Sequence, residues 1–125
     1  MIQLKEKLFD LQWLEDSIER KCQEFQTHEK FGQRIHTIYI INKTASHVSD
    51  KFFNESLMPI LLKLATDPVP NIKFNVSKAI EVLYERMDER NKEAAVEALK
   101  EMETDALDFD VRYYAVKALK SINSK

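Results

Sequence analysis

Three histidines and one cysteine are the side chains of this sequence best suited to hold a metal ion. His28, His36 and His47 are 8 and 11 residues apart, and Cys22 precedes them. None of these four residues has a second ligand at the close spacing that structural zinc sites use. The single glycine of the chain also rules out a glycine-rich phosphate-binding loop. We therefore expect no metal and no cofactor.

Catalysis by a serine would need a motif that activates the hydroxyl, and Ser17, Ser46 and Ser77 lie in no such motif. The acidic stretch over residues 88–105, DERNKEAAVEALKEMETD, is typical of a solvated helix face. A pair of acidic residues can act as general acid and base only in a pocket, which a thin helical stack does not provide. The sequence therefore predicts no enzymatic activity.

The helical elements of the chain are predicted most clearly over residues 57–83. This stretch predicts two helices joined by a stiff turn. Apolar residues recur at steps of three and four on both sides of a break at Asp67-Pro68-Val69-Pro70-Asn71. Two prolines one residue apart disfavour helix and lack amide donors, so they predict a short extended corner. Asn71 is expected to cap the second helix. The two apolar stripes then pack as an antiparallel pair.

This unit recurs along the chain. Arg34, Lys73 and Arg112 are 39 residues apart, and each is followed by an apolar residue, namely Ile35, Phe74 or Tyr113. Asp105 lies 38 residues after Asp67. A fixed period near 40 residues is typical of helix-pair repeats. The alternative interpretation is a helical bundle in which these matches arise by chance.

Composition supports the same fold. The chain has 125 residues, is 44% hydrophobic and 32% charged, and contains three prolines and one glycine. We predict an all-α protein, an α-α superhelix of about three antiparallel helix pairs. It forms a single domain with repeats at about residues 1–48, 49–88 and 89–125, and we expect it to be a fragment of a longer solenoid.

The charge and the ends of the chain limit its location and partners. A net charge of −2 gives no reason to expect nucleic acid or an anionic membrane as a partner. The sequence has no run of 18 apolar residues and no secretory signal at MIQLKEKLFD. Because a single cysteine cannot form an internal disulfide, the chain is expected in the cytoplasm or the nucleus.

The first helix is predicted from Met1 to about Thr27. Leu4, Leu11, Ile18 and Phe25 recur every seven residues, and Glu15 interrupts the stripe. We favour an extended first repeat helix, although a seam that pairs two chains would show the same spacing.

The remaining boundaries follow from breaks in the helical pattern. We expect a tight corner at Gly32, a helix at about 33–47 with Tyr39 among its inward residues, and a helix that begins near Asn54 and is kinked at Pro59. The last pair is expected at about 92–104 and 110–121.

The residues of the central turn resemble those of HEAT repeats. These helix pairs often carry a proline in the first helix and a D-x-x-x-x-(V/I)-(R/K) signature, which Asp67 to Lys73 fits. More narrowly, LMPILLKLATDPVPNIKFNVSKAIEVL resembles a late repeat of the scaffold (A) subunits of protein phosphatase type 2A. DALDFDVRYYAVKALKSI and QRIHTIYIIN are similar to parts of neighbouring repeats of these subunits. The DPVPN turn also occurs in regulatory subunits of type 4 phosphatases, and the first 27 residues depart from the scaffold pattern.

The resemblance implies a non-catalytic scaffold whose intra-repeat turns bind a serine/threonine protein phosphatase catalytic subunit. It also implies a second partner, a further regulatory subunit. The partner-facing residues implied by this likeness lie in the three turns. They are His28, Lys30, Arg34, Pro68, Val69, Asn71, Lys73, Leu107, Asp108, Phe109 and Arg112.

Two alternatives remain open at this point. Asp67 and the basic series could instead form a ladder of ion pairs and helix caps between neighbouring repeats. The chain as a whole could instead be a helical adaptor that self-associates through its long first helix.

Overall fold

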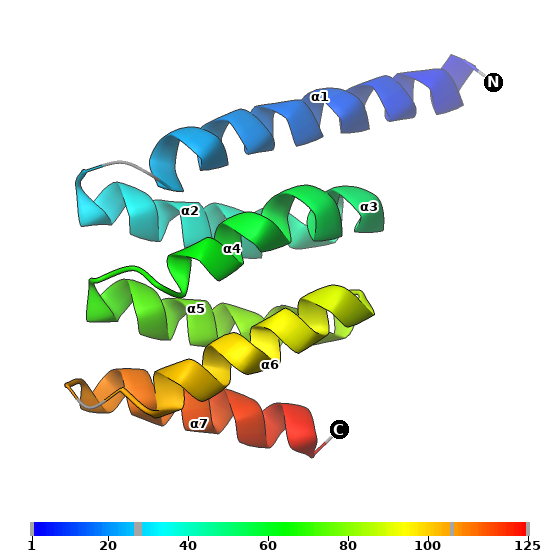
Figure 1. Ribbon diagram of the computed structural model, residues 1–125. Helices are drawn as coiled ribbons and strands as arrows, with labels where there is room; N and C mark the ends of the chain where they lie inside the picture. The colour runs from blue at the N-terminus through cyan, green and yellow to red at the C-terminus, as the bar shows by residue number, and fades with distance from the viewer. Residues whose placement is uncertain (1, 27–28, 106, 125) are drawn as a thin grey trace.

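The computed structural model describes residues 2–26, 29–105 and 107–124, with side chains described for 11–25, 29–105 and 107–124. The chain is a stack of helices (Figure 1). Its long helices are α1 (Ile2–Gln26), α2 (Phe31–Thr44), α4 (Met58–Leu64), α5 (Pro70–Leu83), α6 (Glu89–Glu103) and α7 (Phe109–Asn123). Shorter helical segments are η1 (Ala45–His47), α3 (Asp50–Phe52), η2 (Phe53–Leu57) and η3 (Tyr84–Arg86). The described residues contain no β-strand.

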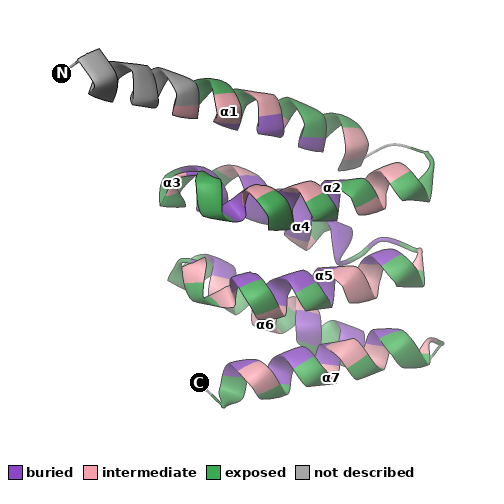
Figure 2. Ribbon diagram, turned by 180° about the vertical axis from the view of Figure 1, so that it is seen from behind, coloured by how far each residue is buried: buried purple, intermediate pink, exposed green. Residues whose placement is uncertain are grey.

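The helices form two layers. One layer contains α1, α4 and α6, and the other contains α2, α5 and α7, as the two opposite views show (Figures 1 and 2). Neighbouring helices in the second layer pack directly, α2 on α5 and α5 on α7. The three turns that join α1 to α2, α4 to α5 and α6 to α7 lie along one edge of the stack. The predicted fold, three antiparallel helix pairs in an α-α superhelix, is confirmed.

The core is a strip between the layers. The facing stripes of the helices bury the apolar side chains that their three- and four-residue spacing predicted (Figure 2). The large side chains that are buried most completely are Ile41, Phe53, Leu57, Met58, Leu61, Ile72, Ile80 and Leu99. Each pair contributes to this strip, so the pairs stabilise one another through stacking.

The helix α5 begins two residues earlier than the capping rule predicted. Its N-cap is Val69, Pro70 is the first helical residue, and Asn71 is therefore not the cap. Proline suits the first helical position because its fixed φ is helical and its missing amide would have no partner there. No side chain caps α5; Asp67 Oδ1 instead accepts a hydrogen bond from the Val69 amide at 3.0 Å, which fixes the turn before the helix.

The first helix of the second pair is continuous from Asp50 to Leu64 but changes its winding before Pro59. It begins four residues earlier than expected, because the Ser49 hydroxyl accepts from the Phe52 amide at 3.1 Å. The segment η2 is a π-helical turn, in which the Met58 amide donates to the Phe53 carbonyl five residues back. The disruption expected at Pro59 thus takes the form of one residue inserted into the helix.

Three further expectations were wrong. Gly32 is the second residue of α2 and has no positive φ, so it forms no tight corner. Tyr39 is 54% exposed rather than inward. The helix α6 begins at Glu89 instead of near Lys92, because the Asp88 carboxylate accepts from the Asn91 amide and caps it.

Candidate partner-binding edge

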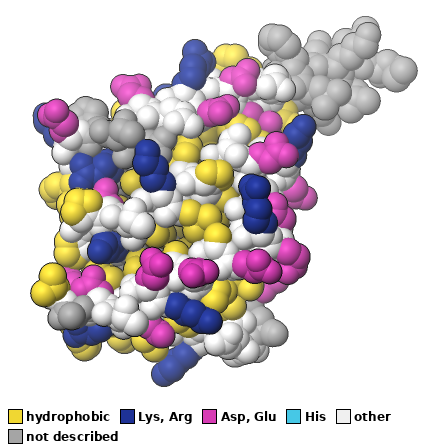
Figure 3. All heavy atoms as spheres, viewed as in Figure 1, with side chains coloured by type: hydrophobic (Ala, Val, Ile, Leu, Met, Phe, Trp, Pro, Cys, Tyr) yellow, Lys and Arg dark blue, Asp and Glu magenta, His cyan; other side chains and the backbone are white. Residues whose placement is uncertain are grey.

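The three turns place most of the predicted partner-binding residues on one edge of the stack. Hydrophobic side chains gather there with lysine and arginine side chains (Figure 3). His28 is outside the described residues. Arg34, Lys73 and Arg112 are each the fourth residue of their helix, so the stack brings the 39-residue basic series to equivalent positions.

Arg34 connects the first turn to the second. Its Nε donates to Asp67 Oδ2 at 2.7 Å, and its Nη2 donates to Asp67 Oδ1 at 3.2 Å. A third nitrogen, Nη1, donates to the Glu29 carbonyl of its own turn at 3.0 Å. The arginine side chain is 14% exposed and the aspartate side chain 7%. A bidentate ion pair between two largely buried side chains is a structural contact, so Arg34 is not offered to a partner here.

Lys73 connects the second turn to the third in the same direction. Its Nζ lies 3.6 Å from Asp105 Oδ2. Together with Arg34 and Asp67, this pair confirms the alternative prediction of an ion-pair ladder between neighbouring repeats. Arg112 occupies the third position, where its Nη1 donates to the Asp105 carbonyl at 2.6 Å.

Asp105 and Asp108 fix the backbone of the third turn. Asp105 Oδ1 accepts from the amides of Leu107 at 2.8 Å and Asp108 at 3.1 Å. Asp108 in turn caps α7 by accepting from the Val111 amide at 3.0 Å. The hydrogen bond from Leu107, helped by the bond from Asp108 and by the positive charge of Lys73, lowers the pKa of Asp105 below its ordinary value of 3.8.

The remaining turn residues are open to a partner in different degrees. Leu107 is 97% exposed and Phe109 is 70% exposed, and Phe31 adds a half-exposed ring at the first turn. The side chains of Lys30, Pro68 and Asn71 are also exposed, whereas Val69 is half-buried against the core. The third turn therefore offers the largest apolar surface along the edge.

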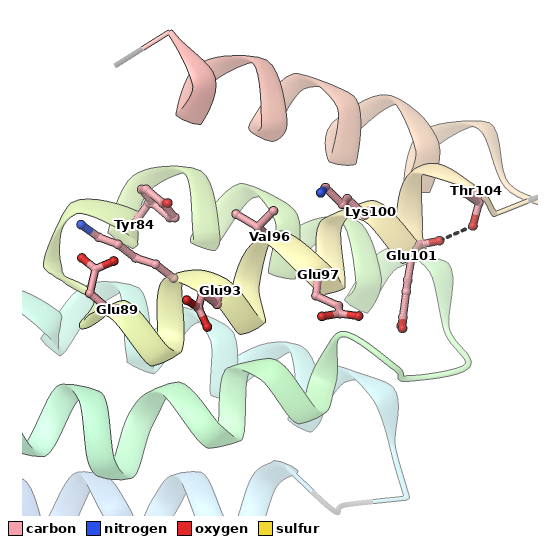
Figure 4. A pocket seen from close by; sticks show the side chains of 9 residues that line it. Tyr84, Glu89, Glu93, Val96, Glu97, Lys100, Glu101 and Thr104 are labelled. Atoms are coloured by element: carbon pink, nitrogen blue, oxygen red, sulfur yellow. Dashed lines mark hydrogen bonds between the residues drawn. The ribbon is translucent and has the colours of Figure 1, made fainter.

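A groove of about 560 Å³ runs along α6, away from the turns' tips. Figure 4 shows Tyr84, Val96 and Lys100 on one side of α6 and the carboxylates of Glu93 and Glu97 on the other. Glu89, Glu93, Glu97 and Glu101 are all exposed, which confirms the expected solvated helix face. The spread of these carboxylates along one helix gives no convergent acid pair.

A buried polar network at the opposite edge was missed from the sequence. The Asn54 Oδ1 accepts from the Asp88 amide at 2.8 Å, and its Nδ2 donates to the carbonyls of Asp50 and Arg86. Asn91 donates to both oxygens of Asn54 at 3.0 Å. The signal in the sequence was the asparagines themselves, a residue type that helices tolerate poorly unless the amide has partners.

Glu15 makes the equivalent contact one repeat earlier. The carboxylate that interrupts the apolar stripe of α1 is buried, and its Oε2 accepts from the Ser49 amide at 2.8 Å. Glu15 and Asn54 are 39 residues apart, as are the N-caps Ser49 and Asp88 that they contact. A second periodic contact thus joins each first helix to the start of the next.

Of the histidines and the cysteine, His36, His47 and Cys22 lie among the described residues, and they form no metal site there. His36 packs edge-on to Phe25 and stacks on Tyr39, with ring centroids 5.5 and 5.7 Å apart. Cys22 is completely buried, and this burial raises the pKa of its thiol to about 11. Within the described parts of the chain, no three His, Cys, Asp or Glu side chains are grouped as a metal site would require. In residues 2–26, 29–105 and 107–124, no helix is both long enough and apolar enough to cross a membrane.

Comparison with known proteins agrees with this architecture. The HEAT repeat family matches residues 57–87, which contain all of α4, all of α5 and the turn between them. The chain is 31% identical over 121 residues to the regulatory A subunit of protein phosphatase PP2A from Saccharomyces cerevisiae, a match that covers 90% of this chain and 19% of that protein. It is 38% identical over 58 residues to the protein of the same name from Schizosaccharomyces pombe, covering 46% of this chain and 10% of that protein.

The fold and the comparisons lead to the same assignment. The matched segments span a fifth or less of the length of these relatives. The chain is an all-α solenoid of helix pairs in which residues 57–87 match the HEAT repeat family, and it is similar to part of the regulatory A subunit of protein phosphatase PP2A.

Proposed function

We propose that this chain is a non-catalytic scaffold segment that binds a serine/threonine protein phosphatase catalytic subunit through its intra-repeat turns. The relatives are named as regulatory subunits of such a phosphatase, and regulatory subunits work together with a catalytic one. A further regulatory subunit is a second partner in this proposal. The segment belongs to a longer solenoid in the cytoplasm or nucleus.

The observation that carries the proposal is the exposure of apolar side chains beside hydrogen-bonded backbone in the third turn. Leu107 and Phe109 are largely exposed, yet Asp105 accepts from the Leu107 amide, and Asp108 caps the helix that begins at Phe109. Ordered apolar tips lose little conformational entropy on binding, and loops held by a rigid scaffold are the usual binding places. Phe31 and Pro68 extend this surface along the other two turns.

The experiment is capture of the purified type 2A catalytic subunit by immobilised wild-type chain and by Leu107→Ala/Phe109→Ala. Loss of two central apolar contacts is expected to weaken binding by at least about tenfold. Asn71→Ala tests the second turn, since the side chain of this exposed residue forms its hydrogen bond within its own helix, with Asn75. Lys73 is a poorer choice, because a change there also breaks the ion pair with Asp105.

Val82→Ala is the matched control. Val82 is 76% exposed on α5 but lies at the end remote from the turn, so its removal should leave capture unchanged. Equal capture by the Leu107/Phe109 variant and the wild type would contradict the proposed edge. Absence of capture by the wild type would contradict the proposed function.

The alternative function is self-association through α1. The described part of this helix exposes less apolar surface for it than the sequence suggests. Ile18 is buried in the stack, and Phe25 packs against His36. The side chain of Leu4 is outside those that the structure describes. Light scattering over a range of protein concentrations distinguishes the two functions, because a chain that stays monomeric at high concentration does not self-associate.

A further inference from the structure

Charge is divided unequally between the two layers of the stack. The helices of the second layer, α2, α5 and α7, contain seven lysines and arginines but only two acidic residues, Glu81 and Asp110. The helices of the first layer, α1, α4 and α6, contain eleven acidic and eight basic residues. The net charge of −2 is therefore the sum of a basic layer and an acidic one.

Four cations of the second layer lie outside the turn edge. Three of the seven, Arg34, Lys73 and Arg112, belong to the basic series of the turns. The other four are exposed lysines, namely Lys43, Lys78, Lys117 and Lys120. We call the surface that these four lysines form the basic face. Among the residues that the structure describes, none of the four forms an ion pair with a carboxylate.

The basic face does not depend on where the chain begins or ends. Helices of the second layer pack on one another along the stack, α2 on α5 and α5 on α7. Figure 2 views the stack from the side of this layer. Lys78 is exposed although a helix packs on each side of α5, and Lys43 is exposed beside α5. A further helix pair would therefore extend this face and not cover it.

Aromatic rings hold two of the ammonium groups in place. Lys78 Nζ lies 4.6 Å from the centroid of the Tyr114 ring and 5.7 Å from that of Phe74, and these two rings stack on each other. Lys43 Nζ lies 5.7 Å from the centroid of the Tyr39 ring. A cation over a ring keeps its full charge. Both ammonium groups are thus positioned without being neutralised, which suits them to bind an anion.

The repeat fixes the spacing of the charges that would match this face. Lys78 and Lys117 are each the ninth residue of their helix, and Tyr39, which carries Lys43, is the ninth residue of α2. Packed helices lie about 8–10 Å apart. A polypeptide in the polyproline II conformation has three residues per turn and rises about 3.1 Å per residue, so every third side chain lies on one side at intervals of about 9 Å. A carboxylate at every third residue therefore matches the stacked lysines.

The aromatic residues favour a polypeptide over a nucleic acid. Proline-rich segments bind to surfaces lined by aromatic side chains, and Tyr39 and Tyr113 are each about half exposed beside the lysines. Bases of a single-stranded nucleic acid instead need free ring faces to stack on. Phe74 and Tyr114 already stack on each other and carry Lys78, so their faces are occupied.

We propose that the basic face binds an acidic, proline-rich segment of another protein in the polyproline II conformation. Carboxylates at every third residue contact Lys117, Lys78 and Lys43 in turn. The residues between them lie against Tyr39 and Tyr113. This surface is separate from the turn edge, and the inference does not rest on the proposed function.

The test uses two fluorescent peptides of identical composition. One contains four Glu-Pro-Pro units, and the other contains four consecutive glutamates followed by eight prolines. Fluorescence anisotropy with the whole chain at about 50 mM NaCl should show that the spaced peptide binds at least about fivefold more tightly. Equal net charge in the two peptides means that long-range attraction alone gives no such preference.

Paired variants locate the binding surface. Lys78→Gln/Lys117→Gln should weaken binding of the spaced peptide by about tenfold and remove its advantage. Lys63→Gln/Lys100→Gln is the matched control, because it removes the same charge from exposed sites on α4 and α6 in the first layer. This control should change affinity by less than about twofold. Thermal unfolding of each variant shows whether the fold is kept.

The outcomes are distinguishable. Preference for the spaced peptide that is lost only in Lys78→Gln/Lys117→Gln supports the inference. Equal affinity for the two peptides, or unchanged binding in that variant, overturns it. Tighter binding of a twelve-nucleotide RNA that the same variant abolishes would assign the face to nucleic acid instead. Self-association that the same variant abolishes, measured by light scattering, would assign the face to the acidic layer of a second copy.

The peptide assay contains no phosphatase. A chain that fails to capture the type 2A catalytic subunit would contradict the proposed function and leave this inference standing. A chain that captures the subunit but shows no preference between the peptides would do the reverse.

Discussion

Arg34 and Asp67, 33 residues apart in the sequence, are joined by two hydrogen bonds of 2.7 and 3.2 Å that connect the first turn of the stack to the second. Asp67 also accepts from the Val69 amide, so one carboxylate both links two repeats and holds the turn that precedes α5. The turn edge is therefore part of the structural framework as well as the candidate binding surface.

Double-mutant cycles should give this ion pair a larger coupling energy than the pair of Lys73 and Asp105. Arg34→Gln and Asp67→Asn are each expected to lower the free energy of unfolding by about 2–4 kcal/mol, because each leaves a mostly buried charge without its partner. Their coupling energy should be about 1–3 kcal/mol. The pair of Lys73 and Asp105 is longer and more exposed, so its coupling should be smaller and should fall with added salt. Equal coupling in both cycles, measured by urea unfolding, would contradict this ranking.

Asn54→Ala should destabilise the stack by about 2–4 kcal/mol, because it leaves several buried backbone and side-chain groups without partners. Asn42→Ala, at an exposed site on α2, is the matched control and should cost less than about 0.5 kcal/mol. Chemical denaturation of both variants measures the difference. Similar values for the two would show that the network adds no net stability.

Acid should weaken the third turn through Asp105. Its pKa in the folded chain lies below 3.8, its value in an unfolded chain, so its ionisation stabilises the fold above that pH. This stabilisation is lost as the pH falls from about 4 through the lower, folded pKa. Asp105→Asn should be less stable at neutral pH but should lose less on acidification, as measured by urea unfolding at pH 6, 4 and 3. Parallel pH profiles for the two chains would exclude this role.

Alkali should weaken the packing around Cys22. The pKa of the buried thiol is about 11, against 9.0 in an unfolded chain, so the unfolded chain releases its proton first. The free energy of unfolding should therefore fall as the pH rises from 9 to 11. Cys22→Ala should lose less over the same interval, and the native thiol should react with a disulfide reagent only as fast as the chain opens. Rapid labelling at pH 8 would contradict the buried, protonated state.

The repeat period and the type of each long helix could be predicted from the sequence because both follow from the spacing of apolar residues. The ladder was predictable too, since Arg34, Lys73 and Asp67 recur with the repeat. The starts of helices were harder to predict. Local rules favoured Asn71 as a cap and Gly32 as a corner, but Pro70 already suits the first helical position and Gly32 needs no special φ in α2.

The contacts that sequence reasoning missed depend on tertiary packing. Glu15 appears as an interruption of an apolar stripe until the start of the next repeat is placed against it. Asn54 and Asn91 find each other only when the first helices of the second and third pairs are stacked. Which exposed turn residues contact a partner also depends on the partner's surface, so that part of the candidate site stays a prediction.

The π-helical turn explains how repeats of unequal length remain aligned. The N-caps Ser49 and Asp88 are 39 residues apart, but Thr66 and Thr104, which both donate to a carbonyl three residues back, are only 38 apart. In the second pair, the additional residue lies inside the helix at η2. In the third pair, an additional residue lies in the turn before Asp108. Small insertions and deletions can accordingly be absorbed without changing the phase of the solenoid. Sequence drift in the helices then leaves the geometry of the turn edge unaltered.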